Sequence, residues 1–219
     1  MNRAEVARIV DHTALRPEMM HADVVALCSE AESLGVYAVC VSPTFVLTAR
    51  RNLPAHISVA TVCGFPSGKH ESSIKAAEAR LSVEQGVDEV DMVIDFGQVL
   101  EGNWTAVKQD IETVRAASAN VLLKVILETA VLDDEQIRQA CLVAQQAGAD
   151  FVKTSTGFHP SGGASIRAVQ VMHATVGGQL GIKASGGIKN WEQACALIDA
   201  GATRLGLSGT RAVLEGSST

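Results

Sequence analysis

The segment AGADFVKTSTGF, residues 147–158, shows the local design that decides the fold of this chain. A helical stretch ends at Gly148, whose lack of a side chain suits the left-handed conformation that often follows a helix. A short apolar strand then begins at Phe151, and Lys153 stands where that strand meets a turn rich in hydroxyl groups. A lysine in such a strand either lies at a sheet edge and extends to water, or it has a partner or a task. The other segments of the chain separate these alternatives.

The same helix-to-strand join occurs four times. Its copies are LGVYAVCVS from Leu34, QGVDEVDMV from Gln85, AGADFVKTS from Ala147 and AGATRLGLS from Ala200, with the glycines Gly35, Gly86, Gly148 and Gly201. Between successive glycines lies one further strand-like run: HISVATVC, VLLKVILE and GIKASG. Each repeat therefore contains two units of strand followed by helix.

Helical patterns occupy the gaps between these strands: Met19 to Ser33, His70 to Gln85, Trp104 to Ala117, Asp133 to Ala147, Ile166 to Thr175 and Asn190 to Ala200. The segment IVDHTAL, residues 9–15, follows a short N-terminal helix and supplies an eighth strand. We therefore predict an α/β fold, a (β/α)8 TIM barrel that forms a single domain over residues 1–219. A doubly wound open sheet is the competing architecture, but no GxGxxG or Walker sequence supports a nucleotide fold.

The composition limits the classes of partner and cofactor. A formal net charge of −6 disfavours nucleic acid and anionic membranes as partners and leaves a small molecule. The N-terminus lacks an apolar signal core and no later stretch suits a membrane span, so we expect a cytoplasmic protein. The 5 cysteines and 6 histidines are scattered, without a CxxC pair or a histidine–carboxylate cluster. We therefore expect neither disulfides nor a metal.

Strand alternation places several charges inside the predicted barrel. In EVDMVIDF, Asp91 and Asp95 face inward, and the same rule turns Lys124, Lys153 and Lys183 inward on three other strands. Their neighbours Val90, Met92, Ile94, Leu123, Val125 and Leu127 then face the helices. Structural ion pairs are one explanation, but buried charges contribute little stability. Desolvation and nearby ammonium groups instead lower the pKa of a lysine, and the neutral amine can attack a carbonyl.

Two glycine-containing loops follow the last two strands. They are Ser185-Gly186-Gly187-Ile188, which leads into a helix, and Leu207-Ser208-Gly209-Thr210. Glycine lets backbone N–H groups approach an anion, and barrel enzymes often hold phosphate at these two loops. Either loop alone is more often an ordinary tight turn. Their joint placement predicts a phosphorylated substrate.

Eight motifs occur in order between about Asp11 and Thr210: DHTAL, VCVSP, GFPSG, EVDMVI, LKVILET, FVKTSTGF, GIKASGG and LGLSGT. Together they resemble the deoxyribose-phosphate aldolases, a family of class I aldolases in nucleoside catabolism and carbohydrate degradation. The resemblance implies a cofactor-independent lyase that reversibly cleaves 2-deoxy-D-ribose 5-phosphate to D-glyceraldehyde 3-phosphate and acetaldehyde. It also implies a homo-oligomer, by family habit a dimer.

The resemblance also implies roles for individual residues. Lys153 matches the Schiff-base lysine, Lys183 the second lysine that perturbs it, and Asp91 the proton-relaying aspartate. Asp11 matches an aspartate that positions the second lysine, and Lys124 a lysine of the same network. The implied substrate contacts are Cys40, Thr156, Gly157, Gly186, Gly187, Ser208 and Gly209, with Cys40 expected to be part of the wall rather than a nucleophile. Asp95, Glu128, His12 and His159 receive no role and are expected to be solvated, loop-capping, structural or peripheral.

One feature departs from the family pattern. Some bacterial relatives end in a longer tail whose terminal tyrosine reaches the active site, whereas this chain ends VLEGSST and has Tyr37 as its 1 tyrosine. A tail-assisted proton shuttle is therefore not implied here. Two rival functions remain open: a Schiff-base aldolase for another phosphorylated aldehyde or ketone, and a non-catalytic sugar-phosphate-binding barrel, since a fold does not prove catalysis.

Overall fold

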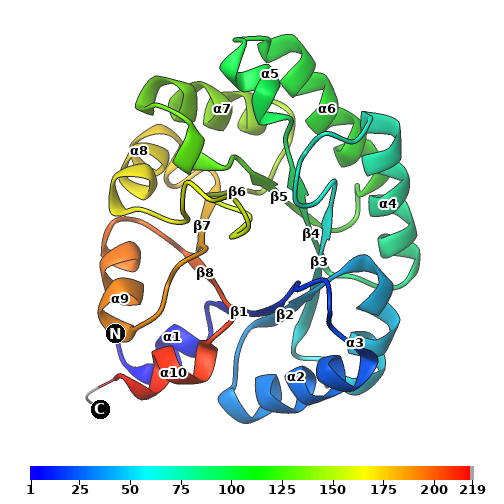
Figure 1. Ribbon diagram of the computed structural model, residues 1–219, viewed down its shortest axis with the longest axis vertical. Helices are drawn as coiled ribbons and strands as arrows, with labels where there is room; N and C mark the ends of the chain where they lie inside the picture. The colour runs from blue at the N-terminus through cyan, green and yellow to red at the C-terminus, as the bar shows by residue number, and fades with distance from the viewer. Residues whose placement is uncertain (218–219) are drawn as a thin grey trace.

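Eight parallel strands pair in chain order and close into a barrel in the computed structural model, which describes residues 1–217 (Figure 1). The last two residues of the VLEGSST tail lie outside the described range. The strands are β1 (Val10–Ala14), β2 (Ala38–Val41), β3 (Ser58–Cys63), β4 (Glu89–Val93), β5 (Leu122–Ile126), β6 (Phe151–Lys153), β7 (Gly181–Ser185) and β8 (Arg204–Leu207). The predicted single-domain TIM barrel is confirmed, with residues 10–14 as its first strand.

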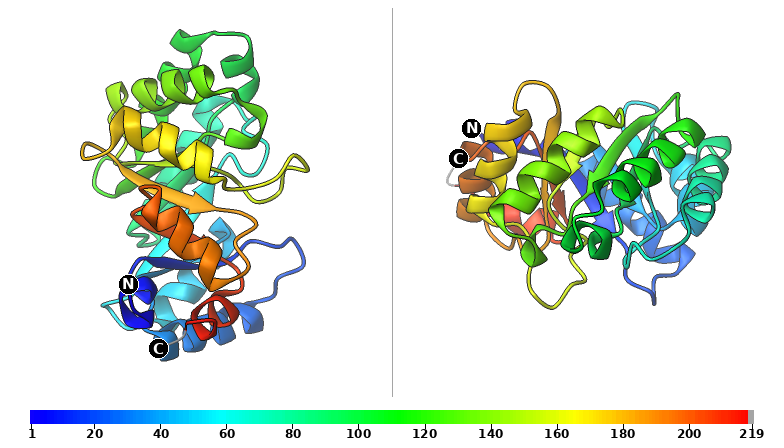
Figure 2. Two further views of the ribbon diagram at one scale, coloured as in Figure 1. Left: turned by 90° about the vertical axis from the view of Figure 1, so that its left-hand side faces the viewer. Right: turned by 90° about the horizontal axis from the view of Figure 1, so that it is seen from above.

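Helices surround the barrel on its outer side (Figures 1 and 2). They are α1 (Arg3–Ala7), α2 (His21–Leu34), α3 (Val46–Asn52), α4 (Ser72–Glu84), α5 (Phe96–Leu100), α6 (Trp104–Ala117), α7 (Asp134–Gln146), α8 (Ile166–Val176), α9 (Trp191–Asp199) and α10 (Thr210–Glu215), with single 3₁₀ turns at η1 (Pro43–Phe45) and η2 (Thr129–Val131). The six predicted helical segments and the short N-terminal helix are confirmed within about two residues at each end, the precision expected of helix boundaries. The sequence reading missed α3, α5 and α10, which are too short to show a clear helical period.

The repeated helix-to-strand join has the predicted backbone geometry. The glycines Gly35, Gly86, Gly148 and Gly201 have φ angles of 65°, 91°, 82° and 117°. Each lies between the end of an outer helix and the start of the next strand. A residue with a side chain is strained at such angles, so these glycines let the chain turn back into the sheet within a few residues.

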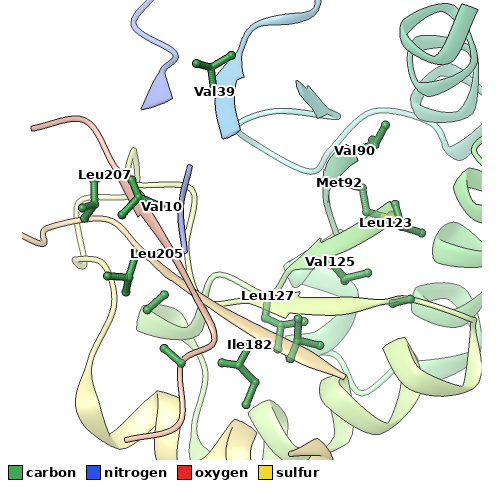
Figure 3. Packing of buried hydrophobic residues seen from close by; sticks show 14 of the residues in the cluster. Val10, Val39, Val90, Met92, Leu123, Val125, Leu127, Ile182, Leu205 and Leu207 are labelled. Carbon is green, nitrogen blue, oxygen red and sulfur yellow. The ribbon is translucent and has the colours of Figure 1, made fainter. Parts of the chain in front are cut away.

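The apolar core lies between the barrel and its helices. All the strand residues predicted to face outward, Val90, Met92, Ile94, Leu123, Val125 and Leu127, are buried in one large cluster there, and Figure 3 shows several of them. A separate small cluster inside the barrel contains Leu15, Cys40, Ala60 and Val62. The predicted alternation is therefore confirmed for these outward-facing residues, and it leaves much of the lumen to polar side chains.

The two ends of the barrel differ in their loops. The loop after β1 and the loop after β6 both protrude on one side, where the strands end (Figure 2). That is the side on which barrel enzymes place their active sites. Within residues 1–217, no helix is long and apolar enough to cross a membrane.

Replacing Leu123 by alanine tests the outer core. Leu123 is fully buried on β5, so we expect Leu123→Ala to lower the free energy of unfolding by about 2–5 kcal/mol. The exposed Leu81 on α4 provides the control, and Leu81→Ala should change stability by less than about 0.5 kcal/mol. Urea denaturation measures both values. Equal losses in the two variants would contradict the assignment of the core.

Candidate active site

Strand pairing brings the predicted charged residues together inside the barrel. In the parallel register Asp91 lies beside Lys124, and Lys153 lies beside Lys183. These four side chains are buried, and Lys153 has the largest exposure among them, at 3%. The charges on β4, β5, β6 and β7 therefore meet in the lumen, away from bulk water.

The Asp91 carboxylate joins the three lysines. Its Oδ2 lies 2.8 Å from the Nζ of Lys153 and 2.8 Å from the Nζ of Lys183, and its Oδ1 lies 2.6 Å from the Nζ of Lys124. Burial raises the pKa of the Asp91 carboxyl, but the three ammonium groups outweigh burial and hold that pKa well below its usual range. Asp91 is therefore ionised and can accept hydrogen bonds from all three lysines.

The three lysines differ in their protonation. Burial lowers the pKa of Lys153, and the neighbouring Lys183 lowers it further, against the opposing effect of Asp91. Burial also acts on Lys183 and Lys124, but the carboxylates around each of them more than compensate and raise both pKa values above the ordinary range. Lys153 is thus the lysine of the cluster best suited to supply a neutral amine near neutral pH.

Asp11 extends the cluster towards β8. It forms an ion pair with Lys183, lies 3.7 Å from the Nζ of Lys124, and accepts a hydrogen bond of 2.8 Å from Arg204. Burial raises the pKa of Asp11, but these three cations outweigh burial and lower it. Asp11 and Asp91 therefore both pair with Lys183.

The sequence reading missed two members of the cluster, Glu89 and Arg204. Glu89 lies 2.5 Å from the Nζ of Lys124 and 3.2 Å from Arg204. Glu89 stands two residues before Asp91 on β4, and Arg204 alternates on β8 with Leu205 and Leu207 of the outer core. The alternation rule that turned Asp91 inward could therefore have found them.

An open cavity of about 680 Å³ lies at the mouth of the barrel. Among the residues described, the cavity lining includes Lys153, Thr156, Gly157, Gly186, Gly187 and Ser208 from the predicted set, together with Ser185 and Phe158. Gly209 does not line it and stands at the start of α10. Of the residues predicted to be catalytic, Lys153 is the one at the cavity surface, and Lys183, Asp91, Asp11 and Lys124 lie behind it.

Cys40 does not line the cavity. It is fully buried on β2 in the small apolar cluster with Leu15, Ala60 and Val62. Burial raises the pKa of its thiol, with a smaller opposing effect of Lys183. A thiol that stays protonated is a poor nucleophile, and a contact of Cys40 with substrate stays a prediction.

Glycines let the loops after β6 and β7 cross in close contact. Gly186 has a φ of 85°, and a side chain there would lie 3.1 Å from the Cα atoms of Gly157 and Gly163. A side chain on Gly163 would lie 2.2 Å from the carbonyl oxygen of Gly186. The two backbones therefore pack directly against each other and form the side of the cavity that includes Gly157, Gly186 and Gly187.

Glu128 is buried rather than solvated and holds the loop after β6. It has a left-handed backbone, with φ 57° and ψ 56°, an uncommon conformation for a residue with a side chain. Its carboxylate accepts hydrogen bonds from the hydroxyl of Thr156, at 2.5 Å, and from the backbone N–H of Thr156, at 3.3 Å. The expectation of a loop-capping carboxylate is confirmed, and that of a solvated one is wrong.

The remaining candidates lie outside the lysine cluster. Asp95 was predicted to face the lumen, but β4 ends at Val93 and Asp95 instead caps α5 and pairs with Lys69 at 2.6 Å. His12 is buried and hydrogen-bonded to Thr210 at 2.7 Å, and burial lowers its pKa. His159 packs edge-on against Phe96, with ring centroids 6.0 Å apart.

A closed (β/α)8 barrel with a low-pKa lysine at its cavity surface, backed by a lysine–aspartate cluster, has the arrangement of a Schiff-base aldolase. The family model described as DeoC/LacD family aldolase matches residues 6–216. The chain belongs to this family, and it is a lyase. The resemblance carried by the eight motifs is thereby confirmed.

Named relatives agree with this assignment. The deoxyribose-phosphate aldolase of Kocuria rhizophila is 58% identical over 217 residues, which cover 99% of this chain and 98% of that protein. The deoxyribose-phosphate aldolase of Mycobacterium ulcerans is 61% identical over 218 residues, covering 98% and 96%. Among solved structures, the tetrameric deoxyribose phosphate aldolase from Aeropyrum pernix superimposes with a TM-score of 0.89 at 30% identity, covering 98% of this chain and 91% of that one.

Removing the Glu128 carboxylate tests its hold on the loop after β6. Glu128→Ala leaves the N–H and hydroxyl of Thr156 without their acceptor, so we expect the free energy of unfolding to fall by about 1–3 kcal/mol and KM to rise. Glu128→Gln retains an amide oxygen as acceptor and serves as the matched control, with a smaller effect on both quantities. Chemical denaturation and steady-state kinetics measure them. An alanine variant with unchanged stability and KM would contradict this role.

Proposed function

We propose that this aldolase reversibly cleaves 2-deoxy-D-ribose 5-phosphate to D-glyceraldehyde 3-phosphate and acetaldehyde, with Lys153 as the nucleophile. The observation that carries the proposal is the placement of Lys153. It lines the cavity, its pKa is lowered, and its Nζ lies 2.8 Å from the ionised carboxylate of Asp91. The names of relatives that match nearly the whole chain at about 60% identity support the choice of substrate.

The reaction begins with the addition of the neutral Lys153 amine to the C1 aldehyde of the open-chain sugar. The carbinolamine that forms loses water and becomes a protonated imine. Lys183 remains charged and shares the Asp91 oxygen that faces Lys153, so the pair can move a proton to or from the reacting nitrogen and oxygen. Asp91 is therefore the proposed proton relay, and Lys183 the proposed acid.

Cleavage then uses the iminium as the electron acceptor. Removal of the proton from the C3 hydroxyl turns C3 of the sugar into the aldehyde carbon of glyceraldehyde 3-phosphate, and the electrons of the broken C2–C3 bond form an enamine on Lys153. Protonation of the enamine at C2 regenerates an imine, and water hydrolyses that imine to acetaldehyde and the free amine. These steps use the chain's own side chains and need no cofactor.

The other proposed site residues hold these groups or the substrate. Asp11 fixes Lys183, and Lys124 neutralises the second oxygen of Asp91. At the cavity, Thr156 and Gly157 are proposed to contact the sugar. The backbone around Gly186, Gly187, Ser208 and Gly209, at the loops after β7 and β8, is proposed to bind the phosphate, with Cys40 as the wall behind the reacting carbons.

The assembly and setting of the chain are also proposals. We propose that residues 1–219 act as one barrel domain in a cytoplasmic homodimer, following the habit that the family resemblance implies. The related enzyme from Aeropyrum pernix is tetrameric, which is consistent with association of barrels of this kind but in a different number.

Chemical trapping tests Lys153 directly. Borohydride reduces an imine irreversibly, so the protein incubated with 2-deoxy-D-ribose 5-phosphate and borohydride should gain an adduct on the peptide that contains Lys153. Lys153→Met should show no adduct and lose cleavage activity by about 10³-fold or more, because covalent catalysis is removed. The partly exposed Lys108, which pairs with Glu112 on α6, supplies the control, and Lys108→Met should behave as the unaltered protein. An adduct on another lysine would contradict the mechanism.

Substrate comparison separates the proposed function from its rivals. Removing the phosphate should lower kcat/KM by about 10²-fold, because the contacts at the loops after β7 and β8 are lost. We therefore expect 2-deoxy-D-ribose 5-phosphate to be cleaved far faster than 2-deoxy-D-ribose, and ketose phosphates not to be cleaved. Faster cleavage of a ketose phosphate would favour another Schiff-base aldolase. Binding of sugar phosphates without cleavage of any would favour a non-catalytic barrel.

A further inference from the structure

The barrel lumen contains a pair of opposite charges that the proposed mechanism does not use. Glu89 begins β4 and Arg204 begins β8, and they are 2% and 6% exposed. Neither residue lines the cavity. Glu89 precedes Asp91 by two residues on β4, and Arg204 is the register neighbour of Lys183 on β7.

Glu89 and Arg204 connect the two halves of the lysine cluster. Arg204 donates a hydrogen bond of 2.8 Å to Asp11, which pairs with Lys183. Glu89 lies 2.5 Å from the Nζ of Lys124, which pairs with Asp91. The Nη1 of Arg204 is also 3.2 Å from Glu89. One continuous network therefore runs from Arg204 through Glu89 and Lys124 to Asp91, the carboxylate that pairs with both Lys153 and Lys183.

The charges of this network do not balance while every lysine is protonated. The cationic side chains are Lys124, Lys153, Lys183 and Arg204, and the anionic ones are Asp11, Glu89 and Asp91. All are buried, where an uncompensated charge is costly. The network is neutral when one cation releases a proton.

The ion-pair partners indicate which cation does so. Lys183 is held by Asp11 and Asp91, and Lys124 by Glu89 and Asp91, whereas Lys153 has Asp91 as its carboxylate partner. Arg204 does not release its proton at any ordinary pH, because the guanidinium is too basic. Lys153 is therefore the cation of the network that releases its proton most readily.

We infer that Glu89 and Arg204 are positioning residues whose fixed opposite charges set the protonation of Lys153, although neither reaches the substrate. The inference rests on the proposed function, because it takes Lys153 as the nucleophile. Arg204 supplies a permanent positive charge and Glu89 a negative one. Removing either charge changes the net charge of the network around Lys153 and therefore the ease with which Lys153 is protonated.

Packing holds Arg204 in its place. Its guanidinium carbon lies 3.8 Å from the centroid of the Tyr37 ring and 5.4 Å from that of Phe151. Attraction between a cation and an aromatic face adds to the ion pairs and fixes the plane of the guanidinium. The position of the charge relative to the network is therefore well defined.

The groups beside Lys153 whose pKa values are shifted keep one charge state near neutral pH. The pKa values of Asp11 and Asp91 are lowered and those of Lys124 and Lys183 raised, so all four remain charged. Burial raises the pKa of Cys40, which stays neutral. Glu128, after the end of β5, accepts a hydrogen bond from Thr156, and His12 of β1, which also lines the cavity, is hydrogen-bonded to Thr210. Lys153 is thus the group whose charge responds.

The test measures the pH dependence of kcat/KM in charge-changing variants. Removing a positive charge makes protonation of Lys153 easier, so Arg204→Met should move the acidic limb of the profile upward by about one pH unit. Glu89→Gln removes a negative charge and should move the same limb downward by a similar amount. The double variant restores the balance of charges and should return the limb to within about 0.3 unit of the unaltered protein.

Conservative and remote variants separate charge from packing. Arg204→Lys keeps the positive charge and should keep the profile even if the protein unfolds more easily. The half-exposed pair of Arg50 and Asp88 supplies a control outside the lumen, and Arg50→Met should leave the limb in place. Circular dichroism verifies that each variant is folded. If Arg204→Met does not fold, Glu89→Gln alone decides, because an unchanged or upward limb would overturn the inference.

Trapping distinguishes this inference from the proposed function. If borohydride places no adduct on Lys153 of the unaltered protein, the proposed function itself fails. If the adduct forms there but the limb moves in the same direction in Glu89→Gln and Arg204→Met, or in neither, the positioning role of these residues is overturned. Opposite movements with adduct formation on Lys153 in all variants support both proposals.

Discussion

The carboxylate of Asp91 lies within hydrogen-bond distance of the side-chain nitrogens of three lysines at once, and the interior of the barrel is arranged around that contact. One carboxylate shared by Lys124, Lys153 and Lys183 cannot neutralise them all. The other carboxylates pair with only two of these lysines. Asp11 pairs with Lys183 and Glu89 with Lys124, which leaves Lys153 with Asp91 alone. The lysine with the least support is also the one that faces the cavity. The three lysines thus differ in pKa because their ion-pair partners differ.

This arrangement depends on a division between the two faces of each strand. The outward face is apolar and packs against the helices, so burial of Leu123, Met92 and their neighbours supplies stability where no chemistry occurs. The inward face contains charges whose desolvation is costly. Because the outer core fixes the strands, the lumen can hold a set of charges that a free-standing cluster would not keep in place. The close crossing of glycine loops then positions the cavity directly over Lys153.

Much of this organisation could be predicted from the sequence, because it follows from regular periods. Repeated glycine joins predicted the barrel, and alternation turned Lys124, Lys153 and Lys183 inward. The same rule placed Asp95 wrongly, because alternation ends with the strand and the end of β4 depends on tertiary packing. Glu89 and Arg204 lie on strands far apart in the sheet order, and their approach across the lumen depends on barrel closure rather than on any local pattern. The unusual backbone of Glu128 likewise has no signal in its residue type.

The burial of the cluster limits its exchange of protons with solvent. Lys183, Lys124, Asp91 and Asp11 have no exposed surface, and Lys153 has only the small part that faces the cavity. Among the described residues of the cluster, Lys153 is the one that meets the cavity, so protons exchanged with bulk solvent pass by its side chain. In the proposed mechanism, the proton taken from the sugar hydroxyl passes to a group of the cluster or to the water released in imine formation. The barrel interior therefore exchanges protons with solvent at the end of the cluster where the proposed chemistry takes place.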